Sequence, residues 1–131
     1  AMNAAVLAYG MFDLRMTPSM AHWGPASLVL STPTVDWFVG NLDGGDRALR
    51  GDPAFSPLLA KLDGFPPALV QIGSLDPLLD DSLFMAARLA TAGSGATLKI
   101  YPGGVHAFDA FDLPLAREAR ADMAAFLRAA A

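Results

Sequence analysis

Three short runs of apolar residues stand out along the chain, and each has the character of a buried strand. They cover residues 4–9, 68–72 and 97–101, and each is followed by glycine or by proline and glycine. The first two are almost unbroken apolar runs, which is typical of strands covered on both faces of a parallel sheet. The hydrophobic pattern therefore predicts three strands.

Helical patterns follow the second and third strands. Apolar residues recur at helical spacing on one face of each segment. They are Leu79, Leu83, Ala86 and Ala90 in the first segment, and Ala116, Ala119, Met123, Phe126, Leu127 and Ala130 in the second. Gly93 is a typical residue just past a helix end. The order strand, helix, strand, helix predicts a βαβα unit with a parallel crossover over residues 66–131.

Residues 11–65 interrupt this regular order with proline, glycine and polar residues. Thr32-Pro33 predicts the cap and first turn of a short helix in this segment. The segment is too long for a simple crossover between two parallel strands. We therefore interpret residues 11–65 as a cap or lid over the strand ends, within one domain that covers residues 1–131.

The composition is more hydrophobic than a self-contained domain of this size needs. Of 131 residues, 53% are hydrophobic and 17% are charged, against about 25% charged in typical soluble domains. Either a deeply buried architecture or a part of a larger fold would explain this excess. No apolar stretch reaches the roughly 18 residues of a transmembrane helix, so we expect no membrane span.

Charge and residue usage exclude several classes of function. The chain has 13 acidic and 9 basic residues, a net charge of −4, and arginines scattered among the acids. Nucleic-acid binders normally show a basic patch, so we expect no nucleic-acid partner. The absence of cysteine excludes disulfides and thiolate zinc sites and fits a cytoplasmic protein. The two histidines lie far apart in the sequence, so we predict neither a metal site nor a cofactor.

Two ionisable residues lie just beyond the second and third strands. Asp76 comes four residues after Ile72, and His106 comes five residues after Tyr101. Ligands of parallel sheets bind beyond the carboxyl ends of the strands, where these two loops emerge together. A carboxylate there can fix the tautomer of a histidine and stabilise its imidazolium form. A structural interpretation stays open, with Asp76 as a helix cap and His106 as a packed or solvated side chain.

Three motifs together resemble one known family. They are PPALVQIGSLDPLLDD at residues 66–81, YPGGVHAF at residues 101–108 and DPAFSPLLA at residues 52–60. They resemble the acid-bearing stretch, the histidine loop and the stretch from cap to sheet of the hormone-sensitive-lipase-like branch of the α/β-hydrolase fold. The resemblance runs from about residue 4 to the end. It implies an α/β fold, namely the C-terminal half of an α/β-hydrolase parallel sheet with flanking helices and a small cap segment.

The same resemblance implies an esterase site. Asp76 would be the acid and His106 the general base of a serine carboxylester hydrolase acting on small acyl esters. One departure is Ala107, where the family usually has glycine after the histidine. A larger departure is the absence of the Gly-x-Ser-x-Gly nucleophile elbow and of the His-Gly-Gly stretch of the oxyanion hole. We expect both to precede residue 1, which leaves this chain inactive without a partner that carries the complementary N-terminal half.

Other residues carry weaker expectations. Trp37, Phe38 and Val39 either line an acyl pocket or pack the cap onto the body, and both roles stay open. Asp80 and Asp81 are expected to complement the positive end of the helix that they begin.

An alternative function remains beside the esterase hypothesis. The chain is then a non-catalytic truncated piece or an oligomeric assembly module. Without upstream strands, the strand at residues 4–9 has an open edge, which invites pairing with another chain. Uncovered apolar surface favours the same outcome. Both readings therefore predict a homo-oligomer or a complex.

Overall fold

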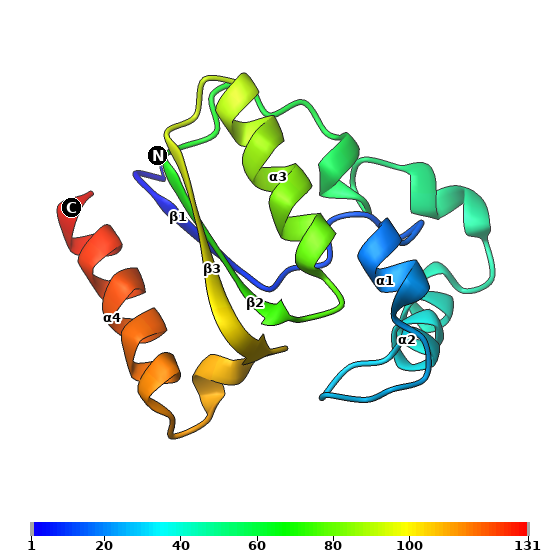
Figure 1. Cartoon of the computed structure of the whole chain (residues 1–131). Coiled ribbons are helices and arrows are strands. Elements are labelled where there is room, and N and C mark those ends of the chain that lie inside the picture. Colours follow the sequence, from blue (N-terminus) through cyan, green and yellow to red (C-terminus); the bar gives the residue numbers. More distant parts are fainter. Residues whose placement is uncertain (1, 131) are drawn as a thin grey trace.

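The computed structural model describes residues 2–130 as a parallel sheet with helices on both faces (Figure 1). Its strands are β1 (Ala5–Ala8), β2 (Ala68–Leu75) and β3 (Ala96–Val105), adjacent in the order β1-β2-β3. Both strand pairs are parallel. The structure confirms the three predicted strands and the α/β class, while Ala1 and Ala131 of the predicted domain lie outside the described residues.

The second and third strands extend further than the apolar runs predict. β2 continues beyond Gly73, and β3 continues through Pro102 and Gly104, with a register irregularity between Gly73 and Leu75. A Cβ atom on Gly73 would lie only 2.1 Å from the carbonyl oxygen of Gly104. The two glycines therefore let the backbones approach closely, and strand pairing persists past the proline that was expected to end it.

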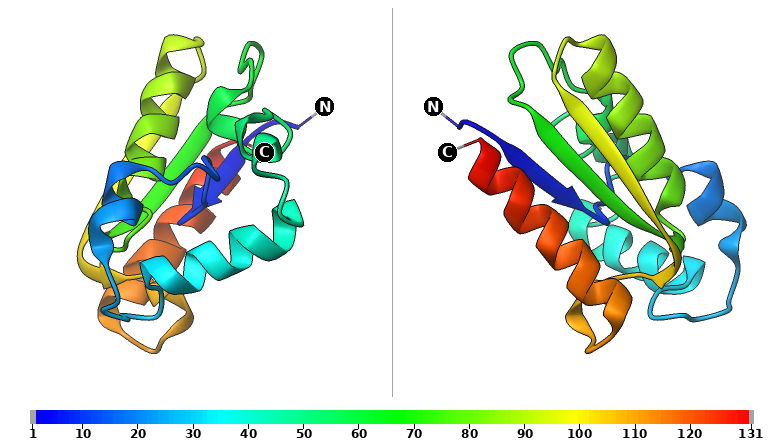
Figure 2. Two further views of the ribbon diagram at one scale, coloured as in Figure 1. Left: turned by 90° about the vertical axis from the view of Figure 1, so that its right-hand side faces the viewer. Right: turned by 60° about the vertical axis from the view of Figure 1, so that its left-hand side comes forward.

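Two long helices cover opposite faces of the sheet (Figures 1 and 2). They are α3 (Leu79–Thr91) and α4 (Pro114–Ala129). Along β2, Val70 packs in the core cluster beneath α3, whereas the Gln71 side-chain nitrogen donates a hydrogen bond to the backbone oxygen of Ala119 in α4. This alternation is the two-residue period of a strand buried on both faces. The predicted βαβα order is present.

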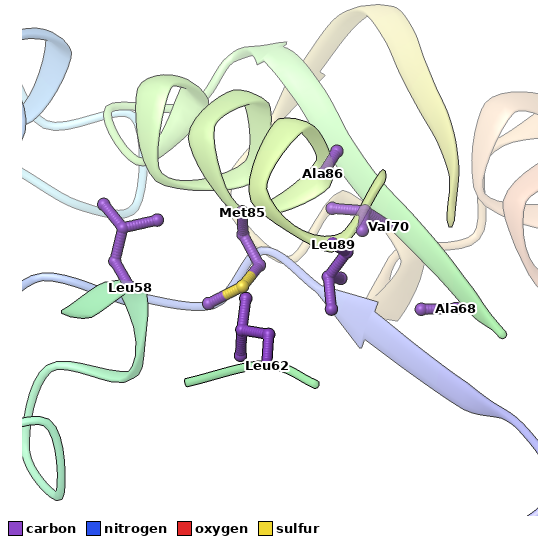
Figure 3. Close-up of a cluster of buried hydrophobic side chains, with 7 residues drawn as sticks. All are labelled: Leu58, Leu62, Ala68, Val70, Met85, Ala86 and Leu89. Carbon is purple, nitrogen blue, oxygen red and sulfur yellow. The ribbon is translucent and has the colours of Figure 1, made fainter. Parts of the chain in front are cut away.

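The buried face of α3 differs from the apolar stripe that the sequence predicts. Its buried residues are Asp81, Ser82, Met85, Ala86 and Leu89. Ala90 is exposed, and Leu83 is half-buried. Figure 3 shows Met85 and Leu89 packed with Leu58, Leu62 and Val70. Ala86 is buried as predicted, but the prediction was wrong for Leu83 and Ala90, because polar Asp81 and Ser82, which a hydrophobic pattern leaves out, begin the buried face.

In α4 the predicted stripe is buried only near its start. Ala116 and Ala119 are buried, Met123 is half-buried, and Leu127 is 48% exposed. The first two pack with Tyr101 of β3. The last turns of α4 therefore lie at the surface in this chain.

Residues 11–65 form two short helices, α1 (Pro18–Trp23) and α2 (Thr32–Asp43), and two 3-10 turns, Arg47–Gly51 and Pro57–Leu59. A second core cluster joins this segment to the end of β2 and the start of α3. Its buried members are Leu14, Met20, Val35, Val39, Ile72 and Leu78. Within residues 2–130, no helix has both the length and the apolar character needed to cross a bilayer.

The cap of α2 is shifted by one residue from its predicted position. Ser31 is the N-cap, and its side-chain oxygen accepts a hydrogen bond from the backbone nitrogen of Thr34. Thr32 is the first helical residue, and its hydroxyl donates to the backbone oxygen of Met20 in α1. Thr32 therefore joins the two short helices, and the preceding serine is the N-cap of α2.

Asp81 anchors residues 12–17 to the start of α3. Its Oδ1 accepts hydrogen bonds from the backbone nitrogens of Phe12 and Asp13 at 2.6 and 3.0 Å, and its Oδ2 accepts from the hydroxyl of Thr17 at 2.6 Å. Asp81 is fully buried. The carboxylate lies in the first turn of the helix as expected, but its three donors make it a tertiary contact.

Asp80 makes a reciprocal contact with Ser19 of α1. The Asp80 carboxylate accepts from the backbone nitrogen of Ser19 at 2.8 Å, and the Ser19 hydroxyl oxygen accepts from the backbone nitrogen of Asp80 at 3.0 Å. The Ser19 hydroxyl also donates to the backbone oxygen of Pro77. Free N–H groups in the first turn of a helix need such acceptors. Here a different helix supplies one.

Replacing Asp81 tests how strongly this anchor holds the fold. Asp81→Ala leaves two backbone N–H groups and one hydroxyl without their acceptor, at about 1–3 kcal/mol for each unsatisfied buried group. We expect the free energy of unfolding, measured by urea denaturation, to fall by about 3 kcal/mol or more. The control is Asp63→Ala, at an exposed carboxyl, which should change it by less than about 0.5 kcal/mol. If the two substitutions lower the free energy of unfolding equally, Asp81 is not a structural anchor.

The pH dependence of stability tests the burial of the same carboxyl. Burial raises the pKa of Asp81, although hydrogen bonds from Thr17 and from the backbone of Phe12 and Asp13 act in the opposite direction. A raised folded-state pKa contributes stability that is complete below the unfolded-state pKa, about 3.9, and is lost as the pH rises through the folded-state value. The free energy of unfolding of the wild type, minus that of Asp81→Asn, should therefore decrease as the pH rises from about 4 toward neutrality. A difference that stays constant or increases contradicts this assignment.

Candidate active site

Asp76 and His106 meet at the carboxyl edge of the sheet. The Nδ1 atom of His106 lies 3.0 Å from Oδ2 of Asp76. Asp76 directly follows β2, and His106 directly follows β3. The other carboxylate oxygen of Asp76 accepts a hydrogen bond from the backbone nitrogen of Leu78 at 2.9 Å. Asp76 thus contacts the histidine and holds the turn before α3, but it is not the helix cap that the structural interpretation expected, because the N-cap of α3 is Leu78.

The environment of the pair favours proton transfer at one nitrogen. Asp76 is 1% exposed, and the His106 side chain is 19% exposed. An ionised carboxylate can only accept hydrogen bonds, so the contact assigns the proton of a neutral imidazole to Nδ1. The lone pair of Nε2 is then free to take a proton. A buried carboxylate can also stabilise the imidazolium that results.

Backbone contacts fix the two loops that carry the pair. Gly73 and Gly104 pack closely, and the hydroxyl oxygen of Ser74 accepts a hydrogen bond from the backbone nitrogen of Gly103 at 2.9 Å. Gly103 has a φ of +78°, a conformation that glycine adopts without strain. These contacts join the residues just before Asp76 to those just before His106.

Ala107 occupies a backbone conformation that favours glycine. Its φ is +53° in the left-handed region, which costs a residue with a Cβ about 1–2 kcal/mol. It precedes a 3-10 turn, Phe108–Ala110, whose Phe108 is buried against Tyr101. The alanine therefore adds strain at this site, yet His106 still lies within hydrogen-bond distance of Asp76.

Trp37, Phe38 and Val39, which were expected either to line an acyl pocket or to pack the cap onto the body, lie in different environments. Val39 is 3% exposed and belongs to the second core cluster, so it packs the segment onto the body. Trp37 and Phe38 are 64% and 56% exposed and form an edge-to-face pair with ring centroids 5.0 Å apart. Within residues 2–130 no enclosed pocket lies beside them. A contact of Trp37 and Phe38 with substrate stays a prediction.

Tyr9 also lies beside the pair, which the sequence reasoning missed. It is the first residue after β1, and its ring centroid lies 5.0 Å from that of His106 with an interplanar angle of 68°. Because β1 is parallel to the other two strands, its carboxyl end lies at the same edge of the sheet as those that precede Asp76 and His106. Each of the three strands therefore contributes one side chain to the site. In the described part of the chain, no group of three or more acidic or histidine side chains could hold a metal.

Comparison with known proteins identifies the family. A family model described as alpha/beta hydrolase fold matches residues 1–110. The chain belongs to the α/β-hydrolase fold family. An esterase from Acinetobacter venetianus is 44% identical over 83 residues, which cover 62% of this chain and 27% of the relative. An ethyl acetate hydrolase from Pseudomonas putida is 37% identical over 92 residues, which cover 70% of this chain and 28% of the relative.

Solved structures give the same result. A crystal structure of an esterase from the bacterial hormone-sensitive lipase family superposes on this chain with a TM-score of 0.85 and 30% identity. The match covers 98% of this α/β-hydrolase chain and 43% of the esterase. The chain thus spans less than half of that structure and about a quarter of the two relatives. The predicted resemblance to esterases and lipases of the hormone-sensitive-lipase type is confirmed.

The contact between Gly73 and Gly104 gives a prediction for the geometry of the site. Gly73→Ala would force the two loops apart, because its Cβ has no room beside the Gly104 carbonyl. We expect a loss of stability of about 1–3 kcal/mol, typical of overpacking, and an altered imidazole environment at His106 in NMR spectra. The matched control is Gly40→Ala in α2, where a Cβ meets nothing within 4 Å and alanine should stabilise the helix by up to about 1 kcal/mol. If Gly73→Ala changes neither the stability nor the NMR signals of His106, the close approach of the two loops is not required.

Proposed function

We propose that this chain supplies the general base and its carboxylate partner to a serine carboxylester hydrolase. The observation that carries the proposal is the 3.0 Å contact between His106 Nδ1 and the buried carboxylate of Asp76. The membership of the chain in a family of esterases and lipases supports it. A partly exposed imidazole beside a buried acid can transfer a proton to or from a group that approaches the sheet edge.

In the proposed reaction, Nε2 of His106 accepts the proton of a serine hydroxyl as the serine oxygen attacks the ester carbonyl. The imidazolium then donates this proton to the leaving alcohol, and water repeats the cycle on the acyl-enzyme. Asp76 stays ionised, holds Nδ1 and stabilises the imidazolium. Backbone N–H groups that bind the developing oxyanion complete such a site.

The nucleophile of this proposal lies outside the chain. No serine in the sequence stands in a Gly-x-Ser-x-Gly elbow. Within residues 2–130, β1 pairs with β2 on one side and with no strand on the other. We propose that a complementary part of the fold carries the serine and joins the sheet at this edge, and that the chain alone is inactive.

The substrates we propose are small acyl esters. A relative named as an ethyl acetate hydrolase supports this size class. We further propose that residues 11–65 act as the cap of the complete site. Trp37 and Phe38 are exposed in this chain. They would then meet the acyl group only after the complementary part of the fold has joined the sheet.

The free edge of β1 also favours the second candidate, an assembly module without catalysis. An unpaired edge strand is a template for pairing with another copy. Leu28, Val29 and Leu42 add exposed apolar surface on the same cap segment. In that case the chain would form a homo-oligomer whose Asp76–His106 pair has no nucleophile to activate.

A fluorophosphonate ester mimic separates these proposals. We expect intact-mass spectrometry of the labelled, purified 13.7 kDa chain to show no adduct, because no serine here is activated. In a complex purified from the native host through a tagged chain, the esterase proposal predicts an adduct on a second chain. His106→Gln should abolish this adduct, while His22→Gln, at an exposed histidine of α1, should retain it. Labelling of the isolated chain contradicts the proposed location of the nucleophile, and no adduct in any complex supports the assembly module.

NMR spectroscopy tests the Asp–His pair without any substrate. A Nδ1–H group held by a buried carboxylate exchanges slowly with water and gives a proton signal far downfield. We expect one such signal in the isolated chain, lost in His106→Gln and in Asp76→Ala and retained in His22→Gln. Its absence from the wild type, or its persistence in Asp76→Ala, contradicts the proposed pair.

A further inference from the structure

One hydrogen bond does not fix an imidazole ring. The contact with Asp76 holds His106 at Nδ1, but a single hydrogen bond tolerates small rotations about the two side-chain torsions of the histidine. A general base needs its second nitrogen aimed at one point, because misplacement by about 1 Å can cost roughly a hundredfold in rate. A second contact on the ring would restrict these rotations.

Tyr9 makes that contact from β1. Its ring meets the His106 ring edge-to-face, with centroids 5.0 Å apart. Such pairs contribute about 0.5–1.5 kcal/mol beyond the area that they bury. The tyrosine is itself held, because its backbone nitrogen donates to the backbone oxygen of Gln71 at 2.9 Å and its side chain packs on the core cluster that contains Ile72.

The backbone at Tyr9 adopts a positive φ, which a residue with a Cβ rarely does. Its φ is +41°, and Ala107 on the other side of the histidine has a φ of +53°. A residue with a Cβ persists in this region only where its surroundings determine it, and such residues cluster at functional sites. The left-handed turn ends β1 and directs the ring of Tyr9 toward His106.

The hydroxyl of Tyr9 lies near a further carboxylate. Burial raises the pKa of Tyr9, and the nearby Asp109, three residues after His106, raises it further. The phenol therefore stays neutral at physiological pH and keeps a hydrogen to donate. Asp109 lies in the same 3-10 turn as the buried Phe108, and its Oδ1 atom is buried without a hydrogen-bond partner among the described residues.

We propose that Tyr9 is a positioning residue that fixes the ring plane of His106. This inference rests on the proposed Asp76–His106 pair. Tyr9 has no part in proton transfer. It restricts the rotation that the single contact with Asp76 leaves free.

Two substitutions at Tyr9 separate the ring from the hydroxyl. Tyr9→Leu removes the aromatic ring and keeps apolar volume, whereas Tyr9→Phe keeps the ring and removes the hydroxyl. We expect the His106 Nδ1–H to exchange with water roughly two- to tenfold faster in Tyr9→Leu, and by less than about twofold in Tyr9→Phe. The matched control is Phe84→Leu, which removes an exposed aromatic ring of α3 and should leave the exchange rate unchanged.

The outcomes distinguish this inference from the function on which it rests. If Asp76→Ala abolishes the signal but Tyr9→Leu leaves its exchange unchanged, the pair stands and the role of Tyr9 is refuted. If the wild type lacks the signal, both are refuted. If Tyr9→Leu does not fold, nuclear Overhauser contacts between the Tyr9 and His106 rings in the wild type decide, and their absence overturns the proposal.

Discussion

The close approach of β2 and β3 at their carboxyl ends determines where the site of this chain forms. Gly73 and Gly104 lack the side-chain atoms that would separate the two backbones, and Ser74 accepts a hydrogen bond from Gly103 across the gap. Asp76 and His106 follow directly. With the two loops joined just before these residues, the carboxylate and the imidazole lie at hydrogen-bond distance.

Two buried carboxylates at the start of α3 have different roles because different donors surround them. Both carboxylate oxygens of Asp81 accept hydrogen bonds from Phe12, Asp13 and Thr17, so Asp81 holds the segment after β1 against the helix. Asp76 has one backbone donor, which leaves its second oxygen for His106. The first is a structural anchor and the second is available for chemistry, although both are carboxylates in the same short stretch.

Strain and packing meet at the same edge of the sheet. Tyr9 and Ala107 both adopt left-handed backbone conformations on either side of His106. Each costs stability. Under the proposed esterase function, a histidine that has to aim one nitrogen would give a physical reason for this cost. The same site has no enclosed pocket within the described residues, which agrees with a chain that spans less than half of the related esterase structure.

The sequence by itself determined the three strands and the βαβα order, because strand runs and parallel topology are local and directional signals. Topology placed Asp76 and His106 at one edge of the sheet but left a structural role for each open, and only the family resemblance implied that they pair. The sequence also predicted the family, since three motifs in order are specific. Only the tertiary structure decided the extension of β2 and β3, the buried face of α3 and the place of Tyr9. Those features depend on glycine contacts, on hydrogen bonds to Asp81 and on a ring from a distant strand. They are pairings between segments far apart in the chain, which a hydrophobic pattern does not contain.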